Sequence, residues 1–132
     1  MILDSTYVIH LIQRQPAAFQ KGIDLFEAGT VRRVPVPVLF EVFYGVEFAE
    51  SNEQRRRARN ALMGYPTVEL NGHLATLAAE LLAGADRAES GDSGVGVNDA
   101  YIGAAAVYYD EPVLTRNVND FEKLSGVAVE TY

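Results

Sequence analysis

The chain has 132 residues and a formal net charge of −7, and 48% of its residues are hydrophobic. These values predict one folded domain, residues 1–132, and argue against intrinsic disorder and against nucleic-acid binding through a broad basic face. The lack of cysteine excludes disulfides and thiolate metal ligands, but a nucleic acid held locally through metal ions stays possible.

The first residues, MILDSTYVIHLI, have no basic segment before their apolar residues and contain Asp4. They therefore do not resemble a secretory signal. No apolar run approaches the ~20 residues that a membrane-spanning helix needs. Together with the lack of cysteine, these features predict a cytoplasmic protein with no membrane partner.

Hydrophobic periodicity in the first half predicts strands that alternate with helices. The predicted elements are strand 1–3, helix 6–14, helix 17–28, strand 31–36 and a helix that begins at Val38. In the second helix, Phe19, Ile23 and Phe26 share one apolar face. The helix from Val38 is apolar on nearly every side, yet it contains Glu41.

The second half continues the alternation after a polar region. The predicted elements are an exposed helix pair over 46–62, strand 67–70, helix 72–89, a flexible loop 90–96, helix 98–109, strand 112–115, the loop RNVNDF and strand 127–131. The basic cluster Arg55–Arg59 is interpreted as a solvated helix face, with contact to RNA or to an acidic partner as the alternative.

Strands that alternate with helices predict a parallel sheet covered on both faces, with a ligand site at the carboxyl ends of the strands. Four acids far apart in sequence fall at that edge: Asp4, Glu41, Asp99 and Asp120. Crowded carboxylates stay ionised only when a cation compensates them. Oxygen ligands without nearby histidine or cysteine favour Mg²⁺ or Mn²⁺, which can activate water against a phosphodiester.

Each acid also has a purely structural interpretation. Asp4 is a suitable helix N-cap, and Asp99 is suited equally to capping and to a site. Glu41 is explained either by a site or by a buried ion pair, because glutamate is rarely buried alone. Asp120 lies in a polar loop where solvation alone accounts for it. Their shared location favours a joint role, which four independent caps would not require.

Four segments together resemble PIN-domain ribonucleases, and most closely the VapC toxins of type II toxin–antitoxin pairs. They are Asp4-Ser5-Thr6, PVPVLFEVFYG around Glu41, GVNDAYIGAAA and VLTRNVNDFEKLSGV. The resemblance covers essentially the whole chain, with the motifs in the family's order and spacing. It implies an α/β/α sandwich that cleaves RNA with Mg²⁺ or Mn²⁺, forms a homodimer and is inhibited by a VapB-type antitoxin.

By this resemblance, Asp4, Glu41 and Asp99 match the family's first three acids, and Asp4 and Asp99 are the expected metal ligands. Many members have an acid directly after Thr-Arg, where this chain has Asn117. Asp120 is expected to be the fourth catalytic acid, and Asp120, Asn117 or a water completes the second metal position.

Three further residues are interpreted as supporting ones. Thr6, like Ser5, is placed to bond the Asp4 carboxylate or a metal-bound water, or it only starts a helix. Thr115 stands at a strand end, where it orients a carboxylate or contacts phosphate. Arg116 is placed to pair with phosphate or with Glu122.

Three other functions are weighed against a nuclease. A phosphohydrolase with an Asp4 nucleophile needs a second acid two residues later, where this chain has Thr6. A receiver-type switch needs an acid pair and a lysine that are not in place. A catalytically impaired PIN-like module that binds RNA or a partner is the main alternative, and Asn117 is its sole support.

Overall fold

The computed structural model describes residues 1–132. Its strands are β1 (Ile2–Leu3), β2 (Val34–Pro35), β3 (Thr67–Val68), β4 (Val113–Leu114) and β5 (Val129–Glu130). Its helices are α1 (Ser5–Ile12), α2 (Pro16–Glu27), α3 (Val36–Phe48), α4 (Asn52–Leu62), α5 (Gly72–Ala88), α6 (Val97–Tyr109) and α7 (Val118–Glu122). No helix combines the length and the apolar character required to cross a membrane.

All strand pairs are parallel, as the alternating pattern predicts. One sheet has the order β1-β4-β5, and β2 pairs with β3 in a second. A single bridge between Ile2 and Arg33 connects β1 to the segment before β2. Because the strands are parallel, the residues that follow β1, β2 and β4 emerge at the same edge.

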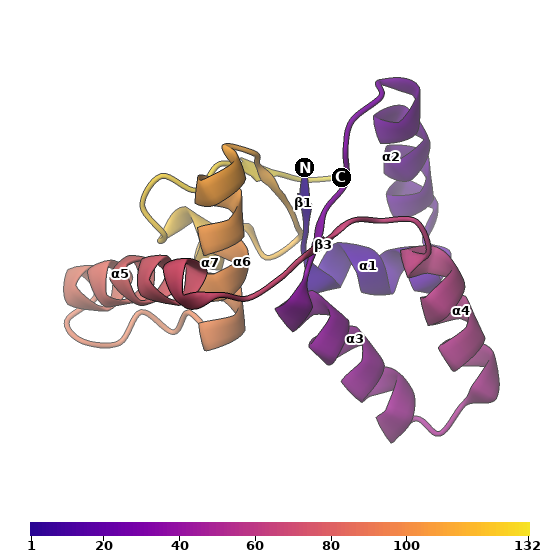
Figure 1. Cartoon of the computed structure of the whole chain (residues 1–132), viewed down its shortest axis with the longest axis horizontal. Helices are drawn as coiled ribbons and strands as arrows, with labels where there is room; N and C mark the ends of the chain where they lie inside the picture. The colour runs from indigo at the N-terminus through magenta and orange to yellow at the C-terminus, as the bar shows by residue number, and fades with distance from the viewer.

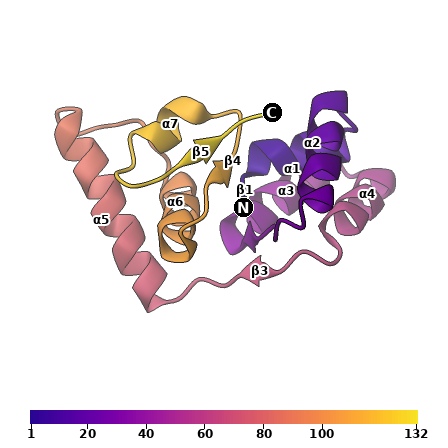
Figure 2. The same cartoon turned by 90° about the horizontal axis from the view of Figure 1, so that it is seen from above.

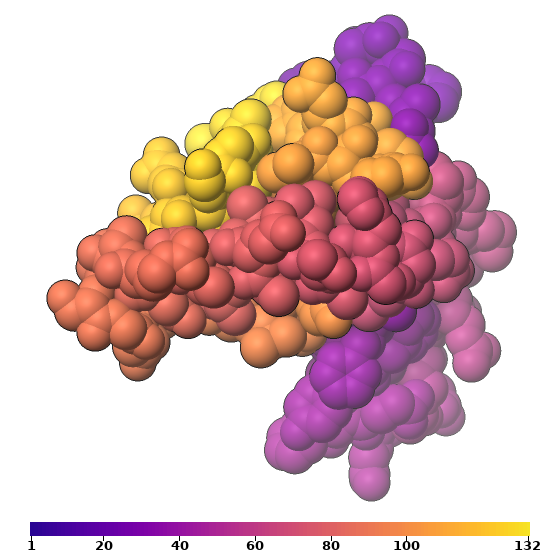
Figure 3. All heavy atoms as spheres, turned by 60° about the vertical axis from the view of Figure 1, so that its left-hand side comes forward, coloured from indigo at the N-terminus to yellow at the C-terminus, as the bar shows by residue number.

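The helices pack around this sheet in two groups, with β1 between them (Figures 1 and 2). One group contains α1 to α4, and the other contains α5 to α7 together with β4 and β5. The segment that carries β3 crosses from α4 to α5 and joins the groups. In the space-filling view, α5 covers the second group, while α3 and α4 project away from it (Figure 3).

α6 packs most extensively against α5 and also contacts β1, β2 and β4. Its small residues Ala100 and Gly103 to Ala106 are all buried, so the helix lies close to its neighbours. Gly103 has no room for a side chain, because a Cβ there would lie 2.6 Å from Leu124 Cδ1.

The prediction that Phe19, Ile23 and Phe26 form the buried face of α2 is wrong. Phe19 and Phe26 are 59% and 72% exposed, whereas Ala18 and Leu25 are buried. Both spacings satisfy the helical period, but the face built on the smaller residues is the one that packs. Periodicity alone does not show which of two apolar stripes meets the core.

Three predicted boundaries also differ from the structure. α3 begins at Val36, so Pro37 lies in its first turn rather than in a turn before the helix. This placement suits proline, because the first helical N–H groups have no partner within the helix. The exposed pair over 46–62 is the end of α3 followed by the single helix α4, and the expected loop RNVNDF contains α7.

Candidate active site

Asp4 follows β1 and caps α1, so its structural interpretation is correct and does not exclude a site. The residue is 3% exposed. Its Oδ2 accepts hydrogen bonds from Thr6 Oγ1 at 2.7 Å, Thr115 Oγ1 at 2.6 Å and the Thr6 amide at 3.4 Å. No hydrogen bond reaches Oδ1. The protein thus fixes one oxygen of the carboxylate and leaves the other available.

The two threonine hydroxyls also hold the turn after β4. Thr6 Oγ1 lies 3.2 Å from Thr115 Oγ1 and accepts a hydrogen bond from the Arg116 amide at 3.2 Å. Thr115 Oγ1 accepts one from the Asn117 amide at 2.8 Å. The start of α1 and the end of β4 are therefore joined into one polar network around Asp4.

Glu41 lies on α3 and is held by uncharged donors rather than by an ion pair. Ser5 Oγ donates to Oε2, and Asn98 Nδ2 donates to Oε1 at 2.8 Å. The expectation that Ser5 bonds Asp4 is therefore wrong, because its hydroxyl reaches across to α3. Asn98 joins α6 to the same carboxylate, and neither contact is evident from the sequence, since each depends on how two helices cross.

Asp99 lies in the first turn of α6, because the helix begins at Val97 with Gly96 at its N-cap. The interpretation of Asp99 as the capping residue is therefore wrong. No side chain donates a hydrogen bond to its carboxylate. The pKa of Asp99 is raised to about 6, first by burial and then by the nearby carboxylates of Asp4, Glu41 and Asp120, while the Gly96 amide acts in the opposite direction.

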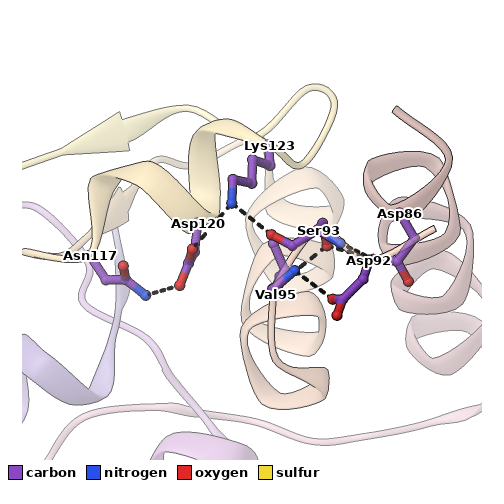
Figure 4. Close-up of polar contacts among 8 residues, drawn as sticks. Asp86, Asp92, Ser93, Val95, Asn117, Asp120 and Lys123 are labelled. Carbon is purple, nitrogen blue, oxygen red and sulfur yellow. Dashed lines mark hydrogen bonds and ion pairs between the residues drawn. The ribbon is translucent and has the colours of Figure 1, made fainter. Parts of the chain in front are cut away.

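Asp120 lies in the first turn of α7 and is partly buried. Its Oδ2 accepts a hydrogen bond from Asn117 Nδ2 at 2.8 Å, and Lys123 Nζ lies 3.9 Å from Oδ1 (Figure 4). The Asn117 side chain is thus turned toward Asp120. The two residues considered as alternatives for the fourth position are bonded to each other.

A second polar network fixes the loop before α6 against α7 (Figure 4). Asp86 on α5 accepts hydrogen bonds from the Ser93 hydroxyl at 2.6 Å and the Ser93 amide at 2.9 Å. Lys123 Nζ donates to the Ser93 carbonyl at 2.7 Å. The loop expected to be flexible is therefore anchored at Ser93, which is 4% exposed.

The four acids share one electrostatic field without forming a preassembled metal site. No three acidic or histidine side chains are close enough together to hold an ion as they stand. The carboxylates of Asp4, Glu41 and Asp120 nevertheless each raise the pKa of Asp99, so all three lie near that residue. Oxygen donors, one of them a carboxylate without a side-chain partner, are ligands that fit Mg²⁺ or Mn²⁺.

Other polar residues are accounted for by local contacts. Arg55 pairs with Glu47, and Arg57 pairs with Glu53, so these members of the basic cluster are neutralised on the helix surface. The sequence offers no partner for His10, but in the structure its Nδ1 lies 2.7 Å from the Tyr132 hydroxyl.

The fold, the parallel sheet and the acids at one edge define a class of protein. The sequence profile of the PIN domain matches residues 1–127, and the chain belongs to the PIN domain family. The resemblance seen in the sequence motifs is confirmed. No curated protein gives a significant sequence match.

Solved structures of toxin–antitoxin complexes share the fold. The chain is 19% identical to a chain of VapBC2 from Rickettsia felis bound to a promoter DNA fragment, with a TM-score of 0.79 over 99% of this chain and 97% of that one. For DNA-bound VapBC from Salmonella typhimurium, the identity is 21% and the TM-score 0.81, with 98% and 96% covered. For VapBC-5 from Mycobacterium tuberculosis, the identity is 25% and the TM-score 0.63, over 98% of this chain and 94% of that one.

Proposed function

We propose that the protein is the toxin of a VapBC-type toxin–antitoxin pair and that it hydrolyses RNA phosphodiester bonds with Mg²⁺ or Mn²⁺. The observation that carries the proposal is the field of four carboxylates centred on Asp99, whose pKa is raised to about 6. Membership of the PIN domain family and the fold shared with VapBC complexes support it.

In this proposal each acid has a distinct role. Asp4 presents Oδ1 to the metal, because its Oδ2 is already held by Thr6 and Thr115. Asp99 is the second metal ligand, since no side-chain donor competes for its carboxylate. Bound Mg²⁺ or Mn²⁺ would supply activation of water and charge stabilisation of the leaving oxyanion.

The other two acids orient water and substrate. Glu41 is fixed by Ser5 and Asn98, so its carboxylate keeps one position relative to α1 and α6. Asp120 is oriented by Asn117, which gives Asn117 a positioning role. Preorganised carboxylates of this kind need no rearrangement as charge develops in the reaction.

Cleavage of a panel of transfer and ribosomal RNAs with Mn²⁺ tests the proposal. We expect wild type to cut at least one RNA and Asp4→Asn/Asp99→Asn to cut at least about 100-fold more slowly. Asp24→Asn/Glu27→Gln, on the exposed face of α2, is the charge-matched control and should cut normally. Equal rates for wild type and the double variant would show that these acids are not the catalytic ones.

A PIN-like module that has lost cleavage is the alternative that Asn117 suggests. Calorimetric titration with Mn²⁺ separates the two functions, because an intact site binds the ion and a lost one does not. The contact between Asn117 and Asp120 favours the enzyme, since Asn117 supports an acid rather than replacing one.

We also propose a VapB-type antitoxin as the partner, seated in the groove between α1, α3 and α4. The groove has a volume of about 250 Å³, and its walls include Ile9, Ile12 and Val46. Glu41 lines the same groove, so a segment bound there would reach the acids. The small protein encoded beside the gene should co-purify with wild type but not with Val46→Arg.

A homodimer through α3 is proposed from its exposed aromatic residues. Phe40, Tyr44 and Phe48 are 64%, 63% and 81% exposed, and their rings follow one another at 6.1 and 6.3 Å. Apolar surface of this extent usually marks an interface. Light scattering should give twice the chain mass for wild type and the single chain mass for Phe48→Lys.

A further inference from the structure

Beside the acids lies a cluster of Arg116, Tyr132 and His10 that the proposed chemistry does not use. The chain after β5 returns toward the start of β1 (Figure 1), and Tyr132 contacts His10 and Tyr7 of α1. Arg116 directly follows Thr115, which donates to Asp4, and its own amide donates to Thr6. The cluster is therefore attached to the network that holds Asp4.

The position of Tyr132 is fixed by two aromatic neighbours. Its hydroxyl lies 2.7 Å from His10 Nδ1, and its ring meets Tyr7 edge to face at 5.1 Å between centroids. Burial raises the pKa of Tyr132. Thr6 and Arg116 lower this pKa, and the charge of Asp4 raises it. The Tyr132 ring is thus a rigid platform within the electrostatic field of the acids.

Arg116 lies over this platform, with its guanidinium carbon 4.5 Å from the ring centroid. This distance allows a cation–π interaction, which holds one face of the guanidinium without using its N–H groups. Arg116 is exposed and forms no ion pair with any carboxylate. Apart from the contact with the Tyr132 hydroxyl, the five N–H donors of its guanidinium are therefore free for a ligand.

Charge decides which ligand suits this arrangement. The chain has a net charge of −7, and Lys123, the other cation beside the acids, is engaged by Asp120 and by the Ser93 carbonyl. A polyanion that approaches the acids is repelled except where a free cation receives it. A guanidinium fork with unused donors matches the geometry of a phosphate.

We propose that Arg116, held on Tyr132, binds the phosphate of a nucleotide next to the cleaved bond of single-stranded RNA. Tyr132 acts as a positioning residue through its ring, and His10 acts through its hydrogen bond to the Tyr132 hydroxyl. The inference rests on the proposed ribonuclease function and names a substrate contact within it. The site thereby combines acids for the reacting phosphate with one cation for its neighbour.

Steady-state cleavage of a fluorescent single-stranded RNA, followed with Mn²⁺, tests the subsite. We expect Arg116→Gln to raise KM about fivefold to thirtyfold with little change in kcat, as for a lost charged hydrogen bond. Arg87→Gln, on the exposed end of α5, removes the same charge and should keep the wild-type KM. Tyr132→Leu should raise KM, while Tyr132→Phe keeps the ring and should have the smaller effect.

Binding of the same RNA in EDTA, measured by fluorescence anisotropy, gives a readout independent of cleavage. Loss of one phosphate contact should reduce the slope of log Kd against log salt by about 0.7 in Arg116→Gln. An unchanged KM and slope in Arg116→Gln would overturn the subsite, as would a fall in kcat at constant KM.

The same measurements separate the two proposals. Wild type that binds the RNA but does not cut it contradicts the ribonuclease function, and the salt slope then still decides the subsite. Wild type that neither binds nor cuts single-stranded RNA contradicts both.

Discussion

The two sides of the acidic site hold their carboxylates in different ways. On the side of α1 and α3, Asp4 and Glu41 accept hydrogen bonds from hydroxyl, amide and backbone donors. On the side of α6, Asp99 has no side-chain donor and its pKa is raised to about 6. Its position is set by packing, because α6 is buried along its small residues.

This difference predicts which side would depend on the proposed cation. The donors around Asp4 and Glu41 compensate their charges within the protein, so these carboxylates are part of the stable structure. The charge of Asp99 is compensated poorly, and ionising it costs free energy that a bound cation would return. Loss of a carboxylate is therefore expected to lower the stability of the protein on the first side and to raise it on the second.

The largest expected effect is a contrast in stability between variants of the two sides. Asp4→Ala removes the N-cap of α1 and the acceptor for two hydroxyls, so it should lower the free energy of unfolding by about 2–4 kcal/mol. Asp99→Asn removes an unfavourable charge, so it should raise the free energy of unfolding at pH 8. Urea denaturation of the metal-free proteins measures both, and equal losses would contradict the comparison.

Thr115→Val removes one donor to Asp4 while keeping the shape of the side chain. Because outer partners orient a metal ligand, we expect Mn²⁺ affinity to fall about 10-fold to 100-fold, as measured by calorimetry. Thr67→Val, at an exposed position of β3, is the matched control and should bind Mn²⁺ like wild type. Equal affinities for the two variants would show that the network around Asp4 is not needed for binding.

Gly103→Ala tests whether close packing holds α6, and with it Asp99, in place. The added methyl would lie 2.6 Å from Leu124 Cδ1, and overpacking of this kind costs about 1–3 kcal/mol. The matched control is Gly45→Ala in α3, where nothing lies within 4 Å of the added Cβ and helix propensity favours alanine. Thermal unfolding should show a lower Tm for the first variant and an unchanged or higher Tm for the second.

The smallest expected effect is the pH dependence that Asp99 contributes. Its pKa is about 6 in the folded chain against an ordinary value of 3.8, so its contribution to stability is complete below pH 3.8 and is lost as the pH rises through 6. From pH 4 to 8, metal-free wild type should lose about 1–2 kcal/mol relative to Asp99→Asn, after allowance for solvent screening.

Urea denaturation across this pH range checks the contribution of Asp99. Saturating Mn²⁺ should reduce the loss of stability of wild type at pH 8, because the ion favours the ionised carboxylate of Asp99. A difference between the two proteins that stays constant with pH would contradict the raised pKa.

Much of the fold and the approximate place of the site were predictable from local pattern. Alternation of strands and helices predicted the parallel sheet, and parallel strands place Asp4, Glu41 and Asp99 at one edge. The exact partners were not predictable, because Ser5 meets Glu41 only through the crossing of α1 with α3. α7 was missed since its five residues are too few to show a helical period.

The pairing of β1 with β4 has a consequence for the synthesis of the chain. β1 is made first, but its partner Val113 and the hydroxyl of Thr115 are made more than a hundred residues later. A nascent chain that ends before β4 has neither the completed sheet nor the network around Asp4. If the acids are those of a toxin, its activity can therefore appear only after β4 and Thr115 have been translated.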